Sequence, residues 1–122
     1  MSDLKLVSRQ YSDHNTVIRV GDELIGAKEL CLIAGPCAVE SEVQLNEIAK
    51  GLSELGVKFM RGGAFKPRTS PYAFQGLKKE GLKMLKNASD TYGLKIVTEV
   101  LDTTLIEDLY SSADILHVRC VL

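Results

Sequence analysis

The sequence has no excess of charge of either sign and no framework of cysteines. Lys plus Arg number 15 and Asp plus Glu 16 among 122 residues, so the chain lacks the basic field that gathers nucleic acid or an anionic membrane. Its three cysteines are odd in number, form no CxxC pair and follow no secretory leader, which predicts a reducing, cytoplasmic setting without disulfides. No apolar run is long enough to cross a bilayer. We therefore expect no nucleic-acid or membrane partner, and any anion site must be local.

Short apolar runs alternate with helical patterns along the rest of the chain. A leading segment, residues 1–29, contains a predicted hairpin in which Gly21-Asp22 joins Val17–Val20 to Glu23–Ile25. In residues 30–122 we predict strands at Cys31–Ala34, Lys58–Met60, Leu94–Val100 and Ile115–Val118. Helices are predicted between them, from the N-cap Ser41 to Gly56, from Leu77 to Gly93, and over residues 105–110 after the caps Asp102, Thr103 and Thr104.

Alternating strands and helices require a parallel sheet with right-handed crossovers. Two architectures fit the order: a small open α/β sheet, or the first half of a (β/α)₈ barrel, which is usually about 250 residues long. In both, ligand sites gather at the carboxyl ends of the strands. The unusual residues of this chain fall at those ends: Pro36-Cys37, the segment 61–70 and Glu99.

The segment from Arg61 to Ser70 is predicted to be a stiff, anion-binding loop. Gly62-Gly63 permit backbone conformations closed to other residues, and Pro67 fixes its own φ while extending the residue before it. The cations suit bidentate recognition of a phosphate or carboxylate, and two hydroxyls add further donors; these side chains are Arg61, Lys66, Arg68, Thr69 and Ser70. A solvated basic loop is the alternative. The glycine spacing is neither a Walker loop nor a dinucleotide fingerprint.

Other reactive residue types have two interpretations each. Cys37 follows Gly-Pro at a strand end, where a thiolate is suited to ligate a metal or attack a substrate, whereas an inert buried cysteine is the alternative. Glu99 ends the third strand, where a carboxylate is suited to orient a water or a cationic side chain. The alternative is a solvated or salt-bridged glutamate. Cys31 and His117 lie within apolar runs, so we expect both to be packed in the core; His14 lies in a polar leader and is expected to be exposed.

Three segments together resemble the 3-deoxy-7-phosphoheptulonate (DAHP) synthases, and most closely their type I beta branch. The segments are Ile33-Ala34-Gly35-Pro36-Cys37-Ala38-Val39-Glu40-Ser41, the whole of 61–76 beginning Arg61-Gly62-Gly63-Ala64-Phe65-Lys66-Pro67-Arg68-Thr69-Ser70, and Thr98-Glu99-Val100. The resemblance covers residues 17–116. It implies a (β/α)₈ TIM barrel, here truncated to about four β/α units, with the leading hairpin closing the bottom of the barrel.

The resemblance also implies an activity and roles for the site residues. DAHP synthases are metal-dependent transferases that condense phosphoenolpyruvate with erythrose 4-phosphate at the first step of the shikimate pathway to aromatic amino acids. Matched by motif, Cys37 is a ligand of the divalent metal (Mn, Fe, Co or Zn type), and Glu99 is an acidic residue near the reacting groups. Arg61 and Lys66 are phosphoenolpyruvate contacts, with Lys66 also near the reacting carbonyl; the erythrose 4-phosphate loop is Pro67, Arg68, Thr69 and Ser70.

A sister family, the 3-deoxy-octulosonate 8-phosphate synthases, carries Lys-Ala-Asn-Arg at the sugar-phosphate loop. This chain has Lys66-Pro67-Arg68-Thr69 there, which favours the four-carbon sugar phosphate.

The chain departs from the family pattern after Ile115-Leu116, where Gly-Ala-Arg-Asn is replaced by the segment 117–122, and Arg119 is out of register with the family arginine. The later His, Glu and Asp metal ligands have no counterpart, so we expect a truncated synthase with most metal ligands missing. The first alternative is a non-catalytic phosphate-binding half-barrel or interaction module, a homo-oligomer that self-associates through exposed sheet edges. The second is an open α/β regulatory module.

Overall fold

The computed structural model describes residues 5, 8–65, 72 and 76–118, and the chain divides into two compact units, residues 1–31 and 32–122. The first unit contains the predicted hairpin. Strand β1 (Ile18–Val20) pairs antiparallel with β2 (Glu23–Ile25), and Val20 lies opposite Glu23. The turn is therefore Gly21-Asp22, with Gly21 at φ +57°, which fits the left-handed turns that join twisted strands.

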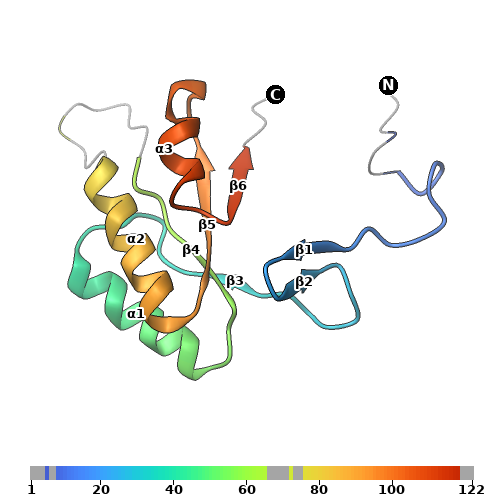
Figure 1. Ribbon diagram of the computed structural model, residues 1–122, viewed down its shortest axis with the longest axis horizontal. Coiled ribbons are helices and arrows are strands. Elements are labelled where there is room, and N and C mark those ends of the chain that lie inside the picture. Colours follow the sequence, from blue (N-terminus) through green and yellow to red (C-terminus); the bar gives the residue numbers. More distant parts are fainter. Residues whose placement is uncertain (1–4, 6–7, 66–71, 73–75, 119–122) are drawn as a thin grey trace. The chain divides into compact units, whose positions relative to one another are not determined.

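The second unit is a four-stranded parallel sheet in which helices connect successive strands along the chain (Figure 1). Its elements follow in the order β3 (Ile33–Ala34), α1 (Glu42–Glu54), β4 (Phe59–Arg61), α2 (Lys78–Tyr92), β5 (Lys95–Val100), the 3₁₀ turn η1 (Thr103–Leu105), α3 (Ile106–Tyr110) and β6 (Ile115–Val118). The predicted α/β class and parallel sheet are confirmed.

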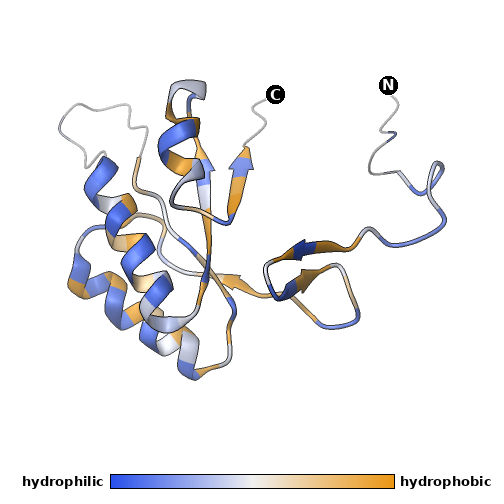
Figure 2. Ribbon diagram, in the orientation of Figure 1, coloured by the Kyte–Doolittle hydropathy of each residue, from blue (hydrophilic) through white to orange (hydrophobic). Residues whose placement is uncertain are grey.

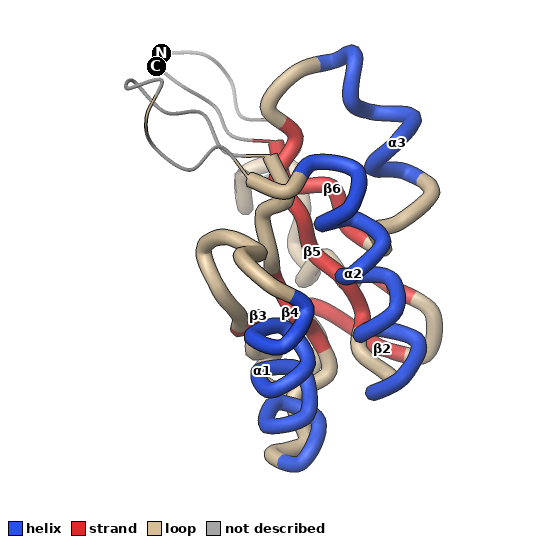
Figure 3. Tube along the Cα trace, turned by 90° about the vertical axis from the view of Figure 1, so that its left-hand side faces the viewer, coloured by secondary structure: helices blue, strands red, loops and turns tan. Residues whose placement is uncertain are grey.

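The strand order β3-β4-β5-β6 follows the chain without reversal. Doubly wound open sheets reverse their strand order at a switch point, which places helices on both faces. Here α1 and α2 lie side by side in front of the strands, and both α2 and α3 contact β5 (Figure 3). The described helices thus cover one face of the sheet, as in a sheet that is wound in a single direction.

Caps fix the helix ends where the sequence predicted them. The Ser41 hydroxyl accepts a hydrogen bond from the backbone N–H of Gln44 at 3.1 Å, and α2 ends at Gly93, whose φ of +67° is left-handed. Asp102 caps η1 by accepting from the backbone N–H and the hydroxyl of Thr104, both at 2.8 Å. These hydrogen bonds, first the backbone one and then the hydroxyl, hold the pKa of Asp102 below its usual value.

The core lies between the sheet and the helices. Apolar residues from β4, β5, α1, α2, α3 and the connecting segments bury their side chains together. They comprise Val39, Leu45, Ala49, Met60, Ala64, Leu82, Leu85, Ala88, Leu94, Ile96 and Leu109. Figure 2 shows the matching pattern on α2, where hydrophilic and hydrophobic residues alternate around the helix. No helix in the described residues is both long and apolar enough to span a membrane.

The first strand of the second unit is shorter and more exposed than the sequence predicted. Only Ile33 and Ala34 pair with β4, and the side chains of Leu32 and Ile33 are 56% and 41% exposed. Cys31, expected in the core, lies outside the strand and is half-buried. The prediction failed because a continuous apolar run specifies hydrophobicity but not which faces are covered, and this strand has only one neighbour among the described strands.

Candidate functional site

The carboxyl ends of β4, β5 and β6 bring three ionisable side chains to one face of the sheet. In the parallel ladders Arg61 pairs with Val97, and Glu99 pairs with His117. Directly paired residues share a face, and residues two apart along a strand do so as well. Arg61, Glu99 and His117 therefore lie on one face, which we call the site face, opposite the face that packs under the helices.

The three side chains line a common small pocket. Its walls are Arg61, Gly62, Gly63, Val97, Thr98, Glu99 and His117, and its volume is about 20 Å³, room for about one water molecule. Arg61 and His117 are exposed, and Glu99 is half-buried. Within the described residues, neither Arg61 nor Glu99 is engaged in an ion pair. No described residue accepts a hydrogen bond from the Arg61 guanidinium, and such a planar group of N–H donors is suited to bind a carboxylate or phosphate.

Hydrogen bonds hold the glycine wall of the pocket in place. The buried hydroxyl of Thr98 donates to the carbonyl oxygen of Gly62 at 2.9 Å, and the Gly62 N–H donates to the carbonyl oxygen of Val97 at 3.2 Å. The Gly63 carbonyl oxygen accepts from the N–H of Val39, in the segment after β3, at 3.0 Å. The wall is therefore tied to both neighbouring strand ends.

The backbone at the paired glycines does not have the unusual dihedral angles that the sequence had suggested, and at Gly62 space is restricted instead. Neither Gly62 nor Gly63 has a positive φ. A Cβ added at Gly62 would lie 2.8 Å from Cδ2 of Leu85 and 3.3 Å from Cγ2 of Val39. A side chain at Gly62 would therefore require the Cδ2 methyl of Leu85 in α2 to shift, a contact between α2 and the strand end that no local sequence pattern encodes.

Gly35 positions the end of β3 against Arg61. Its φ is +149°, and an added Cβ would lie 2.1 Å from the backbone carbonyl oxygen of Arg61. The peptide of Arg61 therefore rests directly on the α-carbon of Gly35, a distance that only glycine permits. Arg61 itself is the last residue of β4, so it belongs to the strand and not to the loop that follows.

The root of the predicted anion loop is closed by backbone contacts. The N–H of Lys78, at the start of α2, donates to the carbonyl oxygen of Ala64 at 2.8 Å, and a Cβ at Gly76 would lie 2.0 Å from the same oxygen. Gly76 has a φ of +96°. The predicted substrate contacts between these ends, Lys66, Pro67, Arg68, Thr69 and Ser70, lie outside the described residues and stay predictions.

Cys37 is exposed in the segment after β3, so the alternative of an inert buried cysteine is wrong. Cys37 does not line the pocket that contains Arg61 and Glu99. Across residues 8–65 and 76–118, no group of three or more His, Cys, Asp or Glu side chains is placed to hold a metal ion. The described part of the chain therefore does not form a metal site, because a transition-metal ion in a protein needs several ligands to fix its geometry.

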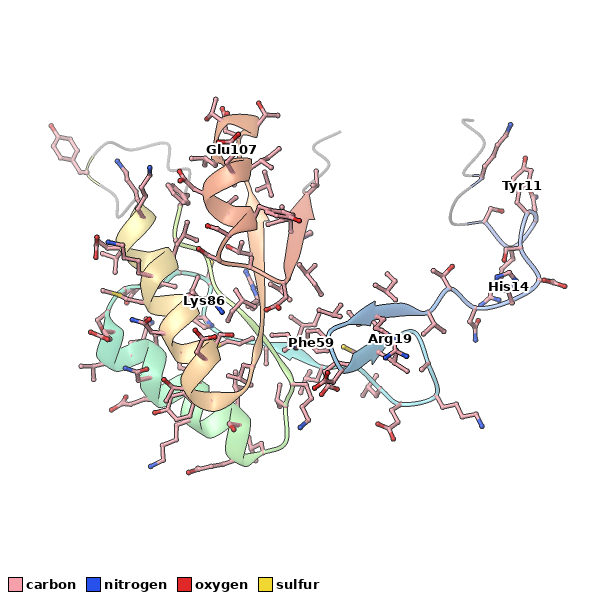
Figure 4. All side chains as sticks on the ribbon, in the orientation of Figure 1. Tyr11, His14, Arg19, Phe59, Lys86 and Glu107 are labelled. Atoms are coloured by element: carbon pink, nitrogen blue, oxygen red, sulfur yellow. The ribbon has the colours of Figure 1, made fainter. Side chains whose placement is uncertain are left out.

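His117 is the site residue that the sequence reasoning missed. We expected it to be packed in the core, but it is exposed on the site face beside Glu99. The alternation along β6 was available as a signal, because Ile115 and His117 share a face, but the register that brings this face to Glu99 is a tertiary feature. His14, in contrast, is exposed as predicted and lies beside Asp13 at 3.2 Å, in the first unit (Figure 4).

Comparison with known proteins shows a family for this chain. Residues 9–120 match the DAHP synthetase I family. A phospho-2-dehydro-3-deoxyheptonate aldolase from Thermotoga maritima is 51% identical over 114 residues, which cover 93% of this chain and 34% of that protein. A 2-dehydro-3-deoxyphosphooctonate aldolase from Fusobacterium nucleatum is 31% identical over 113 residues, 86% of this chain and 41% of that protein.

Solved structures agree with the sequence matches. The crystal structure of a DAHP synthase from Thermotoga maritima superposes with a TM-score of 0.90 at 48% identity and covers 98% of this chain. A truncated form of 3-deoxy-D-arabino-heptulosonate 7-phosphate synthase from the same organism gives 0.80 at 44% identity over 94% of the chain. This chain spans 35% and 41% of those two chains, respectively. The matched range, the identities and the superposition together show that the chain belongs to the DAHP synthetase I family.

Proposed function

We propose that this chain provides the phosphoenolpyruvate-binding part of a 3-deoxy-7-phosphoheptulonate synthase. The observation that carries the proposal is the position of Arg61, whose guanidinium lies at the carboxyl end of β4, lines the pocket with Glu99 and the glycine wall, and has no ion-pair partner among the described residues. Family membership names the substrate that such a cation would bind. The chain spans about a third of the length of the Thermotoga relative, so the complete reaction is part of the proposal.

In the proposed reaction, carbon 3 of phosphoenolpyruvate attacks the aldehyde carbon of erythrose 4-phosphate, water adds at carbon 2, and phosphate leaves. Arg61 holds an anionic group of phosphoenolpyruvate by paired N–H donors. Lys66 binds the same substrate near the reacting carbonyl, and the segment Pro67–Ser70 binds the sugar phosphate. Glu99 orients a water or a cationic side chain in this proposal, and its position two residues along β5 from Val97, on the same face, supports the role.

We also propose that the four parallel strands are the first strands of a (β/α)₈ barrel. The one-way strand order and the single helix-covered face support this arrangement, because barrels keep their helices outside and fill the inner face with side chains. In that arrangement the site face is the inner face, and Arg61, Glu99 and His117 lie at the end of the barrel where active sites occur.

The metal that the family uses would take Cys37 as one ligand. The described residues supply no second and third ligand beside it, so we assign no catalytic step to a metal in this chain. Cys31 and Cys37 are both free thiols, which is consistent with a reducing compartment, and we propose the cytoplasm.

Binding of phosphoenolpyruvate to Arg61→Ala tests the proposal. A hydrogen-bonded charge contributes about 1.5–3 kcal/mol, so the variant should bind phosphoenolpyruvate about 10- to 100-fold more weakly in a calorimetric titration. Arg19→Ala is the matched control, because Arg19 is also an exposed strand arginine but lies in β1 of the first unit. Equal affinities for wild type and Arg61→Ala would contradict the proposal.

A turnover assay separates the enzyme from a second candidate, a non-catalytic phosphate-binding module that self-associates. Exposed apolar side chains at the two edge strands favour the second candidate, because such edges can pair with another chain. Leu32, just before β3, is 56% exposed, and Val118, at the end of β6, is 74% exposed. Loss of the enol absorbance with Mn²⁺, phosphoenolpyruvate and erythrose 4-phosphate would establish the synthase activity, and arabinose 5-phosphate in its place tests the sister activity. Binding without turnover, in a chain that sediments as a dimer or larger species, would favour the module.

A further inference from the structure

We infer that His117 is a second anion contact of the Arg61 pocket and makes ligand binding dependent on pH. The inference rests on the proposed function and adds a residue to which neither the family pattern nor the sequence reasoning gave a role. The ligand class is a small anion that carries a phosphate, sulfate or carboxylate group.

His117 lies on the site face, beside Glu99 and Arg61. Its Cα is the ladder partner of Glu99, so its side chain leaves the sheet on the same face as those of Glu99 and Arg61. All three residues line the same pocket and come from three neighbouring strands. A ligand that touches Arg61 in this pocket is therefore within reach of the imidazole.

The imidazole of His117 is accessible to a ligand. His117 is exposed, and its ring has no hydrogen-bond partner among the described residues. A histidine held for structural reasons usually has a ring nitrogen engaged by a carboxylate or a carbonyl. Both ring nitrogens of His117 are instead available to a ligand, and both are donors when the ring is protonated.

Charged side chains of both signs surround His117 on the site face. Among the described residues, the charged groups on the site face near His117 are Glu99 from β5 and Arg61 from β4, with Lys95 farther down β5. On the opposite face of β6 the described residues Leu116 and Val118 are apolar, so these two side chains direct no charge at the ring. Among the described residues of the site face, the charges of Arg61 and Glu99 offset each other while the imidazole is neutral, and a protonated His117 adds a positive charge.

Protonation of the imidazole would add a positive charge to the pocket, so its affinity for anions should be higher in acid than in alkaline solution. An exposed ion pair is worth up to about 1 kcal/mol, which predicts an increase of about two- to fivefold between pH 8 and pH 5.5. The anion and the proton are linked reciprocally, so binding at intermediate pH should take up protons.

Sulfate is the probe, because its charge does not change across this range, whereas that of a phosphate ester does. Titrations at low ionic strength follow the affinity at pH 5.5 and pH 8, and calorimetry in two buffers of different ionisation enthalpy measures the protons taken up. The variant is His117→Gln, which keeps a hydrogen-bonding side chain without the charge. His14→Gln is the matched control, since His14 is exposed with an 80% accessible side chain and lies in the first unit.

The expected result is a pH-dependent affinity and proton uptake in wild type and His14→Gln, and neither in His117→Gln, whose affinity stays at the wild-type value of pH 8. If all three proteins bind phosphoenolpyruvate through Arg61 and respond equally to pH, the role of His117 is overturned while the proposed function survives. If wild type binds neither sulfate nor phosphoenolpyruvate, both are overturned.

Discussion

Replacement of Gly35 by alanine tests whether the end of β3 sets the position of Arg61. The added Cβ would start 2.1 Å from the Arg61 carbonyl oxygen, so the two strand ends must separate by about 0.9 Å to reach the 3.0 Å limit of real contacts. Such overpacking costs about 1–3 kcal/mol. The φ of +149° adds backbone strain, which for a side-chain-bearing residue is about 1–2 kcal/mol or more.

Gly56→Ala is the control that separates the cost of backbone strain from the cost of steric overlap. Gly56 has a φ of +76°, and nothing lies within 4 Å of an added Cβ, so this variant has backbone strain without overlap. We expect Gly56→Ala to lose about 1–2 kcal/mol of unfolding free energy and Gly35→Ala about 2–5 kcal/mol. Urea denaturation followed by circular dichroism measures both values, and phosphoenolpyruvate affinity should fall only for Gly35→Ala.

Equal destabilisation by Gly35→Ala and Gly56→Ala would contradict the proposed contact between Gly35 and the Arg61 peptide. That result would mean that the β3 and β4 ends separate freely, and that Gly35 does not hold the Arg61 peptide.

Three further changes test the core, the glycine wall and a cap. Leu85→Ala removes a fully buried core side chain and should lower the unfolding free energy by about 2–5 kcal/mol, whereas Val43→Ala, at a 69% exposed position of α1, should change it by less than about 0.5 kcal/mol in the same urea titration. Thr98→Val leaves the Gly62 carbonyl without its buried donor and should cost about 1–3 kcal/mol, more than Thr98→Ser, which keeps the hydroxyl. Because hydrogen bonding lowers the pKa of Asp102 in the folded state, its carboxylate stabilises the fold at neutral pH and this contribution is lost as the pH falls through the folded pKa. The stability difference between wild type and Asp102→Asn should therefore be present at pH 7 and disappear in acid, and a difference that persists unchanged at low pH would contradict the assignment.

Local features of the fold were predictable because they depend on neighbouring residues. The hairpin around Gly21-Asp22, the N-cap Ser41 and the C-terminal Gly93 each follow from the conformational preferences of a few residues in sequence. The alternation of elements also predicted a parallel sheet with its reactive residues at one edge.

The features that failed depend on contacts between distant segments. The length of β3 is set by how much of it finds a partner, and the exposure of His117 by which strands flank β6 and what covers the site face. The close approach of Leu85, in α2, to Gly62 is likewise a contact between distant segments. A single sequence contains the period of each element, but not the register in which one element meets another.

The one-way strand order also has a consequence for the order in which the chain folds. Each ladder of the four-stranded sheet joins a strand to its predecessor along the chain, so no pairing has to wait for a remote strand. Closing shorter loops costs less entropy, and sheets built from nearer contacts form faster. As the chain leaves the ribosome, β3 and β4 can pair across α1 before β6 has been synthesised. The strand order thus permits assembly in chain order, with Arg61 in place before Glu99 pairs beside it, and Glu99 before His117.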